Sequence, residues 1–232
     1  MQLFYATKTQ ISEGTLSVDE SNHCVRVLRK KEGDEIQLMD GEGGLYKATV
    51  LDANAKKCTF EIKDKSFSKS DLPDLHVLIC PTKNLDRFEF FVEKACELGI
   101  REITPVLAFN SERKHLNVEK LRKRMVAACK QSYTLHFPLI NEVITFKDAI
   151  DASVEGSQKF IAHCYSTETP ELKEQKRTIP TIVLIGPEGD FSKEEVQMAE
   201  EKGFSAVTLG AKRLRTETAG LYVCSVFNIL RN

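Results

Sequence analysis

The chain has 232 residues, of which 41% are hydrophobic and 29% are charged, and its formal net charge is −1. This length accommodates one large domain or two smaller ones around a real core, and the composition is that of an ordinary soluble protein. Because the net charge is close to zero, the chain is not a globally basic nucleic-acid binder, and any such site is a local patch.

The apolar runs and the cysteines exclude further classes of protein. No apolar run approaches the length of a bilayer-spanning helix, and residues 1–5 lack the basic-then-apolar pattern of a signal sequence. The seven cysteines are scattered without a C-x-x-C pair, and no histidine pair has metal-ligand spacing. We therefore expect a cytoplasmic protein with no membrane partner, no disulfide and no metal site.

Residues 1–68 are predicted to form a small β-rich domain. Strands are expected at residues 2–6, 35–39, 45–50 and 58–62. The glycine-rich segment 40–44 predicts a hairpin turn between two of them. One helix is expected at residues 19–29, with Val25 and Leu28 on its apolar side.

The end of that helix carries three cations at helical neighbour spacing, Arg26, Arg29 and Lys30. Two interpretations fit this basic edge. It is either a solvated helix end whose cations compensate the helix dipole, or a patch that contacts RNA phosphates.

A polar linker at residues 69–74 precedes a second domain over residues 75–232, in which strands alternate with helices. Strands are expected at residues 75–80, 101–107, 159–164, 181–185 and 206–209. Helices are expected before Gly99, over residues 117–132, after Ser192 and from Thr216 onward. This alternation predicts an α/β fold with a mostly parallel sheet.

Two of these strands end in glycine, at Gly186 and at Gly210, and a polar loop follows each. Ligands bind beyond the carboxyl ends of strands in open α/β sheets, and glycine lets a ligand approach the backbone closely. Either loop alone is explained as well by an ordinary strand-to-helix turn. The second loop, however, is followed by three charged residues, Arg213, Arg215 and Glu217. Together the two loops predict a ligand site.

Four segments carry the motifs of one known family. Residues 185–189 contain Ile-Gly-Pro-Glu-Gly, and residues 209–219 run from Leu-Gly to Leu-Arg-Thr-Glu-Thr-Ala. Residues 23–29 read His-x-x-x-Val-Leu-Arg, and residues 93–99 read Glu-Lys-Ala-x-Glu-Leu-Gly. In these segments the chain resembles the 16S rRNA uridine N3-methyltransferases, a family of the SPOUT superfamily of S-adenosylmethionine-dependent enzymes.

The resemblance implies a fold and a set of partners. It implies a PUA-like small β-barrel that binds RNA over residues 1–68, and a SPOUT methyltransferase domain with a C-terminal trefoil knot over residues 75–232. The expected cofactor is S-adenosylmethionine. The expected partners are 16S rRNA or the small ribosomal subunit and a second copy of the chain, with neither a membrane nor a metal ion involved.

The resemblance also implies site residues. The residues expected to hold the cofactor lie on the two glycine loops: Ile185, Gly186, Pro187, Glu188, Gly189, Leu209, Gly210, Leu214, Arg215 and Thr218. The residues expected to contact RNA are basic: Arg26, Arg29, Lys30, Lys83, Arg87 and Arg113. The sequence departs from the family inside the loops. Asp190 stands where a further glycine is common, and Lys212-Arg213 where an arginine and an aliphatic residue are usual.

Methyl transfer to N3 of uridine determines what a catalytic residue must do. Donor and acceptor must be aligned within about 3 to 3.5 Å. N3 carries a proton, and its loss leaves negative charge on the uracil ring, which a guanidinium stabilises. We expect Arg215 to supply that guanidinium. Glu217 either accepts the proton or orients Arg215, and as a carboxylate in a first helical turn it is also favoured by the helix dipole alone.

Two other functions compete with this one. A different SPOUT reaction, ribose 2′-O methylation, would use the same pocket, although the ribose methylases that we would compare have other N-terminal domains. A noncatalytic RNA-binding module would keep the fold without the chemistry. The presence of Arg215, Glu217 and three loop glycines argues against a loss of activity.

Overall fold

The computed structural model describes residues 3–152, 156–165, 169–175 and 180–229. The chain divides into two compact units. Unit 1 comprises Met1–Asp71 with Val126–Phe137, and unit 2 comprises Leu72–Met125 with Pro138–Asn232.

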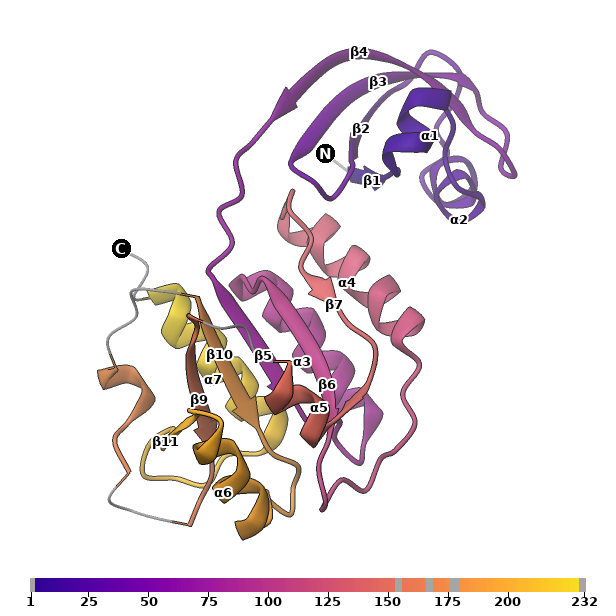
Figure 1. The fold of residues 1–232 in the computed structure, drawn as a ribbon. Coiled ribbons are helices and arrows are strands. Elements are labelled where there is room, and N and C mark those ends of the chain that lie inside the picture. The colour runs from indigo at the N-terminus through magenta and orange to yellow at the C-terminus, as the bar shows by residue number, and fades with distance from the viewer. Residues whose placement is uncertain (1–2, 153–155, 166–168, 176–179, 230–232) are drawn as a thin grey trace. The chain divides into compact units, whose positions relative to one another are not determined.

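Unit 1 is built on a four-stranded sheet with the order β1-β2-β3-β4 (Figure 1). Its strands are β1 (Leu3–Tyr5), β2 (Glu35–Met39), β3 (Gly44–Asp52) and β4 (Thr59–Phe67). The strands β1 and β2 are parallel, and β2, β3 and β4 pair antiparallel. All four predicted strands are present, and β4 extends five residues beyond its predicted end at residue 62. Helix α1 (Lys8–Glu13) was not predicted, although its capping box between Thr7 and Gln10 is a sequence signal.

The predicted helix at residues 19–29 is wrong in its second half. Helix α2 (Val18–Asn22) passes into a π-helical turn, His23–Val27, in which the Leu28 N–H donates to the carbonyl of His23 five residues earlier. Arg29 is left-handed, with φ +57°. The wider turn still packs Val25 and Leu28 against the core of unit 1. Arg26 and Arg29 therefore do not share the edge of one α-helix.

The hairpin turn between β2 and β3 is held by a buried carboxylate. Asp40 accepts hydrogen bonds from the backbone N–H of Glu42 (2.7 Å) and Gly44 (2.9 Å) and from the hydroxyl of Tyr46 (2.9 Å). Burial and this hydroxyl bond raise the pKa of Tyr46 to about 12. A carboxylate with three donors tolerates burial in a small β unit.

The C-terminal half of helix α4 (Val118–Ser132) belongs to unit 1, together with the residues after it. Lys130 forms an ion pair with Glu20 (2.5 Å), and the Gly43 N–H donates to the carbonyl of Leu135 (2.9 Å). These contacts join residues 126–137 to the first sheet, although they fall inside the predicted range 75–232.

Unit 2 contains a parallel sheet with the strand order β11-β9-β10-β5-β6-β7, and β8 pairs with β6 (Figure 1). Its strands are β5 (Leu75–Ile79), β6 (Glu102–Leu107), β7 (Leu139–Ile140), β8 (Ile144–Thr145), β9 (Gln158–Ala162), β10 (Thr181–Ile185) and β11 (Ser205–Val207). Every described strand pair in it is parallel, so the carboxyl ends of the strands meet at one edge. The predicted parallel sheet is confirmed.

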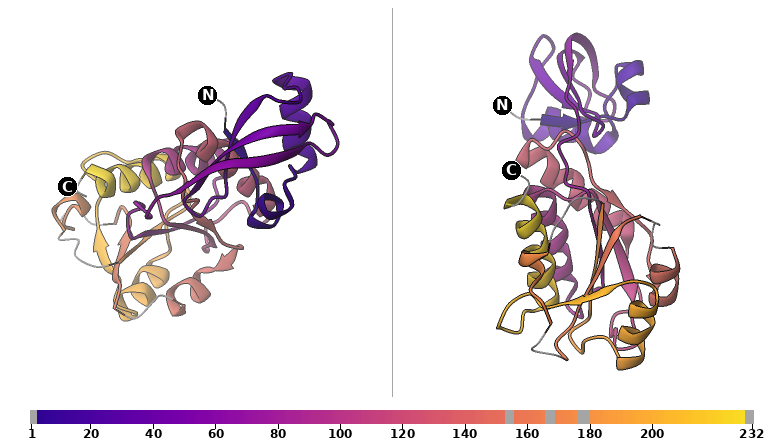
Figure 2. Two further views of the ribbon diagram at one scale, coloured as in Figure 1. Left: turned by 90° about the horizontal axis from the view of Figure 1, so that it is seen from above. Right: turned by 60° about the vertical axis from the view of Figure 1, so that its left-hand side comes forward.

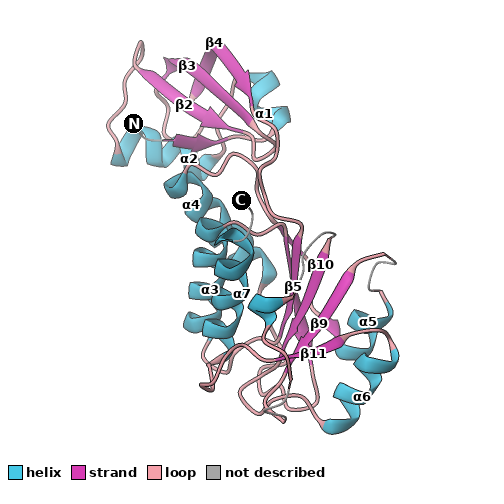
Figure 3. Ribbon diagram, turned by 90° about the vertical axis from the view of Figure 1, so that its left-hand side faces the viewer, coloured by secondary structure: helices cyan, strands magenta, loops and turns pink. Residues whose placement is uncertain are grey.

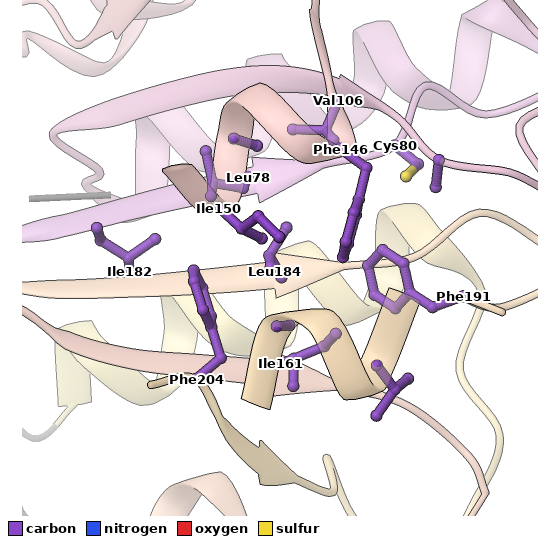
Figure 4. Packing of buried hydrophobic residues seen from close by; sticks show 14 residues of the cluster. Leu78, Cys80, Val106, Phe146, Ile150, Ile161, Ile182, Leu184, Phe191 and Phe204 are labelled. Carbon is purple, nitrogen blue, oxygen red and sulfur yellow. The ribbon is translucent and has the colours of Figure 1, made fainter. Parts of the chain in front are cut away.

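Helices cover both faces of this sheet (Figure 3). Helices α3 (Leu85–Leu98) and α7 (Thr216–Ile229) lie on one face, and α5 (Phe146–Asp151) and α6 (Lys193–Glu201) lie on the other. Figure 4 shows the core beneath α5 and α6, where Phe146 and Phe191 pack with Leu184. Because both faces are covered, all five residues of β10 are buried, which explains its continuous apolar sequence.

Helices α3 and α7 pack side by side, as Figure 2 shows. Gly220 of α7 makes this approach possible. A Cβ atom added to Gly220 would lie 2.5 Å from Cε2 of Phe91 and 3.0 Å from Cδ1 of Ile79. On its other side α3 meets α4, where the buried Glu89 accepts from Lys120 (2.5 Å) and Arg124 (2.9 Å). These cations lower the pKa of Glu89.

Residues 169–175, between β9 and β10, contain a 3-10 turn, Leu172–Glu174, in which Leu172 is fully buried. The Leu172 N–H donates to the carbonyl of Thr208, which fixes the turn beside the end of β11. No helix in the described ranges has both the length and the apolar character to cross a membrane.

Candidate active site

The two glycine loops lie on one cavity of about 1050 Å³ in unit 2. Gly186 follows β10 and Gly210 follows β11, and β9 runs between these strands. The carboxyl ends of β9 and β10, residues from 169 to 174, and the loop 208–216 form the wall. The predicted convergence of the two loops is therefore present, with the third strand end between them.

Eight of the ten residues expected to hold the cofactor line this cavity: Ile185, Gly186, Pro187, Glu188, Leu209, Gly210, Leu214 and Arg215. The other two lie outside its lining. Gly189 packs against Asn110, whose Cβ lies 3.1 Å from the Cβ position that a side chain at Gly189 would occupy. Thr218 is exposed in the first turn of α7.

The conformation of the first loop depends on Asp190. Its φ is +64°, a left-handed conformation that glycine adopts freely and aspartate tolerates. Its Oδ2 accepts from the Cys164 N–H (2.9 Å) and its Oδ1 from the Phe191 N–H (2.9 Å). Asp190 therefore adopts a conformation that is easiest for glycine, and its carboxylate joins the loop to the end of β9.

Two neighbouring loops brace the first one. Glu188 Oε1 accepts from the Lys83 N–H (3.0 Å), beyond the end of β5. The side-chain amide of Asn110, beyond the end of β6, donates to the carbonyls of Gly189 (3.2 Å) and Asp190 (3.0 Å). The strand ends of β5, β6 and β10 are thus connected along the edge of the sheet that carries the cavity.

A hydrogen bond connects the start of α7, directly after the second loop, to the first loop. The Thr216 hydroxyl donates to the carbonyl of Gly186 (3.0 Å), so the first residue of α7 is tied to the end of β10. Gly210 has φ +113°, a conformation that strains any side-chain-bearing residue. Lys212, Arg213 and Arg215 are exposed along this loop and also line the cavity.

The two predicted catalytic residues lie in different surroundings. Arg215 is in the wall of the cavity. Glu217 is buried and is not part of that wall, and its Oε1 lies 4.0 Å from Nε of Arg87 on α3. In the part of the chain that the structure describes, no ion pair joins Arg215 to Glu217.

The residues predicted to contact RNA divide between the units. In unit 1, Arg26 and Arg29 are exposed, and Lys30 donates to the carbonyl of Glu35 (2.9 Å). In unit 2, Lys83 pairs with Glu112 (2.7 Å). The guanidinium of Arg113 donates to the backbone carbonyls of Thr82 and Lys83, at distances from 2.7 to 3.3 Å. Arg113 therefore holds the loop after β5 in place.

The end of β9 contributes cavity residues beyond the predicted set. Ala162, His163 and Cys164 line the wall. His163 Nδ1 accepts from the Tyr165 N–H (3.2 Å), whereas its Nε2 is buried without a hydrogen-bond partner. Partial desolvation of the thiol and the nearby carboxylate of Asp190 raise the pKa of Cys164, although the residue as a whole is exposed. The available sequence signal was the position of residues 159–164, because a strand next to β10 must end at the same edge.

The cavity suits an organic ligand better than a metal ion. Among the described residues, no group of three or more histidine, cysteine, aspartate or glutamate side chains is arranged to hold a metal. The wall instead combines backbone at Gly186 and Gly210 with the carboxylates of Glu188 and Asp190 and with three basic side chains of the loop 208–216. Such a wall fits an organic molecule that carries polar and charged groups.

Comparison with known proteins identifies the family. Residues 68–228 match the family model of an RNA methyltransferase domain, and residues 16–63 match that of an RNA methyltransferase PUA domain. The ribosomal RNA small subunit methyltransferase E of Mesomycoplasma hyopneumoniae (strain 232) is 30% identical over 228 residues, which cover 96% of this chain and 97% of that protein.

Two solved structures are similar over almost the whole chain. The crystal structure of a probable rRNA-methyltransferase from Porphyromonas gingivalis has 34% identity and a TM-score of 0.91, covering 99% of this chain and 98% of that one. A ribosomal RNA small subunit methyltransferase E from Neisseria gonorrhoeae, bound to S-adenosyl methionine, has 26% identity and a TM-score of 0.85 with the same coverage. With its parallel sheet, its glycine-lined cavity and these relatives, the chain belongs to the ribosomal RNA small subunit methyltransferase E family.

Proposed function

We propose that this chain transfers the methyl group of S-adenosylmethionine to N3 of a uridine near the 3′ end of 16S rRNA. The observation that carries this proposal is the single cavity on which both glycine loops and Arg215 lie. Membership of the family supports the reaction class, and the cofactor bound to the Neisseria gonorrhoeae relative supports the choice of methyl donor.

The cavity fits this cofactor on three grounds. Its volume of about 1050 Å³ is at the upper end of the range for small-molecule sites. The backbone at Gly186, Leu209, Gly210 and Leu214 is available for the adenosine and methionine portions. The carboxylates in the wall complement a cationic ligand. When bound, S-adenosylmethionine supplies a methyl group activated by its positively charged sulfur.

The residues of the chain prepare the acceptor. Arg215 stabilises the negative charge that develops on the uracil ring when N3 releases its proton to solvent water. The burial of Glu217 beside Arg87, outside the cavity wall, supports an orienting role for this carboxylate over direct proton acceptance. Arg215 is the residue that acts on the reacting base, and Glu217 and Arg87 fix the start of α7 from which Arg215 projects.

The proposal also includes the domain architecture and the oligomeric state of the chain. Residues 1–68 form the PUA-like barrel that binds RNA, with the exposed Arg26 and Arg29 on phosphates, and residues 75–232 form the SPOUT domain. Membership of the family supports a C-terminal trefoil knot. The exposed Phe90 on α3 and Ile229 on α7 support a homodimer, and the substrate places the protein in the cytoplasm.

Replacing Gly210 by valine is expected to weaken S-adenosylmethionine binding at least tenfold. The φ of +113° at Gly210 is strained for valine, so the loop must change its conformation. That change would displace the backbone groups that are proposed to contact the cofactor. Titration calorimetry on the folded variant measures the loss. Gly33→Val is the matched control, because Gly33 also has a positive φ and open surroundings but lies in unit 1. Equal binding by the Gly210 variant and the wild type would contradict the assigned loop.

Mass mapping of methylated nucleosides tests the reaction itself. The protein is incubated with S-adenosylmethionine and with small ribosomal subunits that lack the modification, and in a parallel arm with protein-free 16S rRNA. We expect N3-methyluridine as the product. A ribose 2′-O-methylated nucleoside would establish the rival SPOUT reaction. If the folded protein binds RNA but yields no methylated nucleoside, the noncatalytic RNA-binding module is correct.

A further inference from the structure

Phe109 is the most exposed large hydrophobic side chain among the residues that the structure describes, at 82% exposure. It lies two residues beyond the end of β6. All strands of unit 2 are parallel, so Phe109 is at the carboxyl edge of the sheet, the edge that also carries the cavity. A phenyl ring that is open to solvent at this edge is not explained by packing.

The backbone beneath this ring is fixed. The Phe109 N–H donates to Oε1 of Glu195 (2.8 Å), a buried carboxylate whose Oε2 accepts from the Ser192 N–H (2.9 Å). The Ala108 N–H donates to the Ser111 hydroxyl, and the Ser111 N–H returns to the Ala108 carbonyl, each at 3.0 Å. The turn therefore fixes the backbone position from which the exposed ring projects.

The same turn is connected to the cavity wall. Asn110, the next residue, donates to the carbonyls of Gly189 and Asp190, and Asp190 lines the cavity. Lys114, five residues after Phe109, is exposed, and the described part of the chain gives it no ion-pair partner. A ring and a cation on one short loop beside a nucleotide-modifying site match the two components of RNA, a base and a phosphate.

We propose that Phe109 is a stacking platform for an unpaired base of the substrate RNA, next to the base that is methylated. This inference rests on the proposed function and adds a substrate contact to it. A phenyl ring stacks on any base, because every base has a π face, and single-stranded RNA is bound in this way. Because the backbone beneath the ring is already fixed, stacking has to order only the side-chain torsions of Phe109.

Steady-state kinetics on small ribosomal subunits test the platform. Phe109→Ala is expected to raise the KM for subunits by roughly tenfold, the scale of losing one stacked base, with kcat and S-adenosylmethionine affinity unchanged. Phe109→Trp is expected to retain or lower the KM, because indole also stacks. Met198→Ala, which truncates an exposed apolar side chain on α6 away from the cavity wall, is the control and should leave the KM unchanged.

Three outcomes would overturn the inference. If the wild type is active and Phe109→Ala has an unchanged KM, the stacking role of Phe109 is refuted, whereas the proposed function is not affected. Conversion of a wild-type dimer to monomer by Phe109→Ala, seen by sedimentation, would make the ring a contact between copies of the chain. A wild type that methylates no RNA refutes the proposed function, and the platform with it.

Discussion

Replacing Arg215 by alanine is expected to lower the rate of methyl transfer by about 10²- to 10³-fold, the usual effect of removing one preorganised group that stabilises developing charge. The guanidinium lies in the cavity wall, and no other predicted catalytic residue does. The affinity for S-adenosylmethionine should change little, because the loop backbone remains. Single-turnover methyl transfer gives the rate, and calorimetry gives the affinity.

Two further variants sharpen this test. Arg213→Ala removes an exposed guanidinium from the same loop and the same cavity wall, and it should affect the rate far less. Arg215→Lys keeps the charge but loses the planar fork of donors, so an intermediate rate is expected. If Arg215→Ala and Arg213→Ala slowed methyl transfer equally, the rate would depend on the total positive charge of the loop. The assignment of a specific catalytic role to Arg215 would then be wrong.

Replacing Gly220 by alanine is expected to destabilise unit 2 by about 1–3 kcal/mol, the usual cost of overpacking a core, and valine should cost more. The added Cβ meets the buried ring of Phe91 at 2.5 Å. Alanine is favoured over glycine inside a helix by about 1 kcal/mol, so any destabilisation must arise from the clash. The midpoint of urea unfolding, followed in the full chain, measures the change.

A matched control and a double variant identify the cause. Thr218→Ala introduces alanine at an exposed position of the same helix and should leave stability unchanged or slightly raised. Phe91→Leu removes part of the ring that Gly220 faces, and in combination with Gly220→Ala it should cost less than the two single changes summed. Strict additivity would show that the two helices do not meet at this point.

The sequence predicted the architecture of unit 2 well because its signals are local. The run at 181–185 is the observed β10, since a strand buried on both faces must be apolar throughout. The rule that parallel strands end at one edge then brings Gly186 and Gly210 to one cavity. The family and the enzyme class that the motifs indicated are confirmed by the matching family models and relatives.

Other features depend on contacts that no local pattern encodes. The π-helical turn at residues 23–27 arises because Val25 and Leu28 pack on the core of unit 1, and helical spacing alone favours an unbroken helix. Arg113 has the charge expected of an RNA contact, yet its guanidinium binds carbonyls of a loop thirty residues earlier. The trefoil knot, the barrel, the homodimer, the domain bounds and the roles of the site residues stay predictions.

The hydrogen bond between Thr216 and Gly186 has a thermodynamic consequence. This hydrogen bond and the packing of α7 on β10 join the helix that ends the described chain to the corner that follows β10, so we expect the two segments to open together. A ligand held by the corner must therefore slow amide exchange far along α7, out to turns that it never touches. By the same linkage, substitutions that destabilise α7 are expected to lower the affinity for the cofactor.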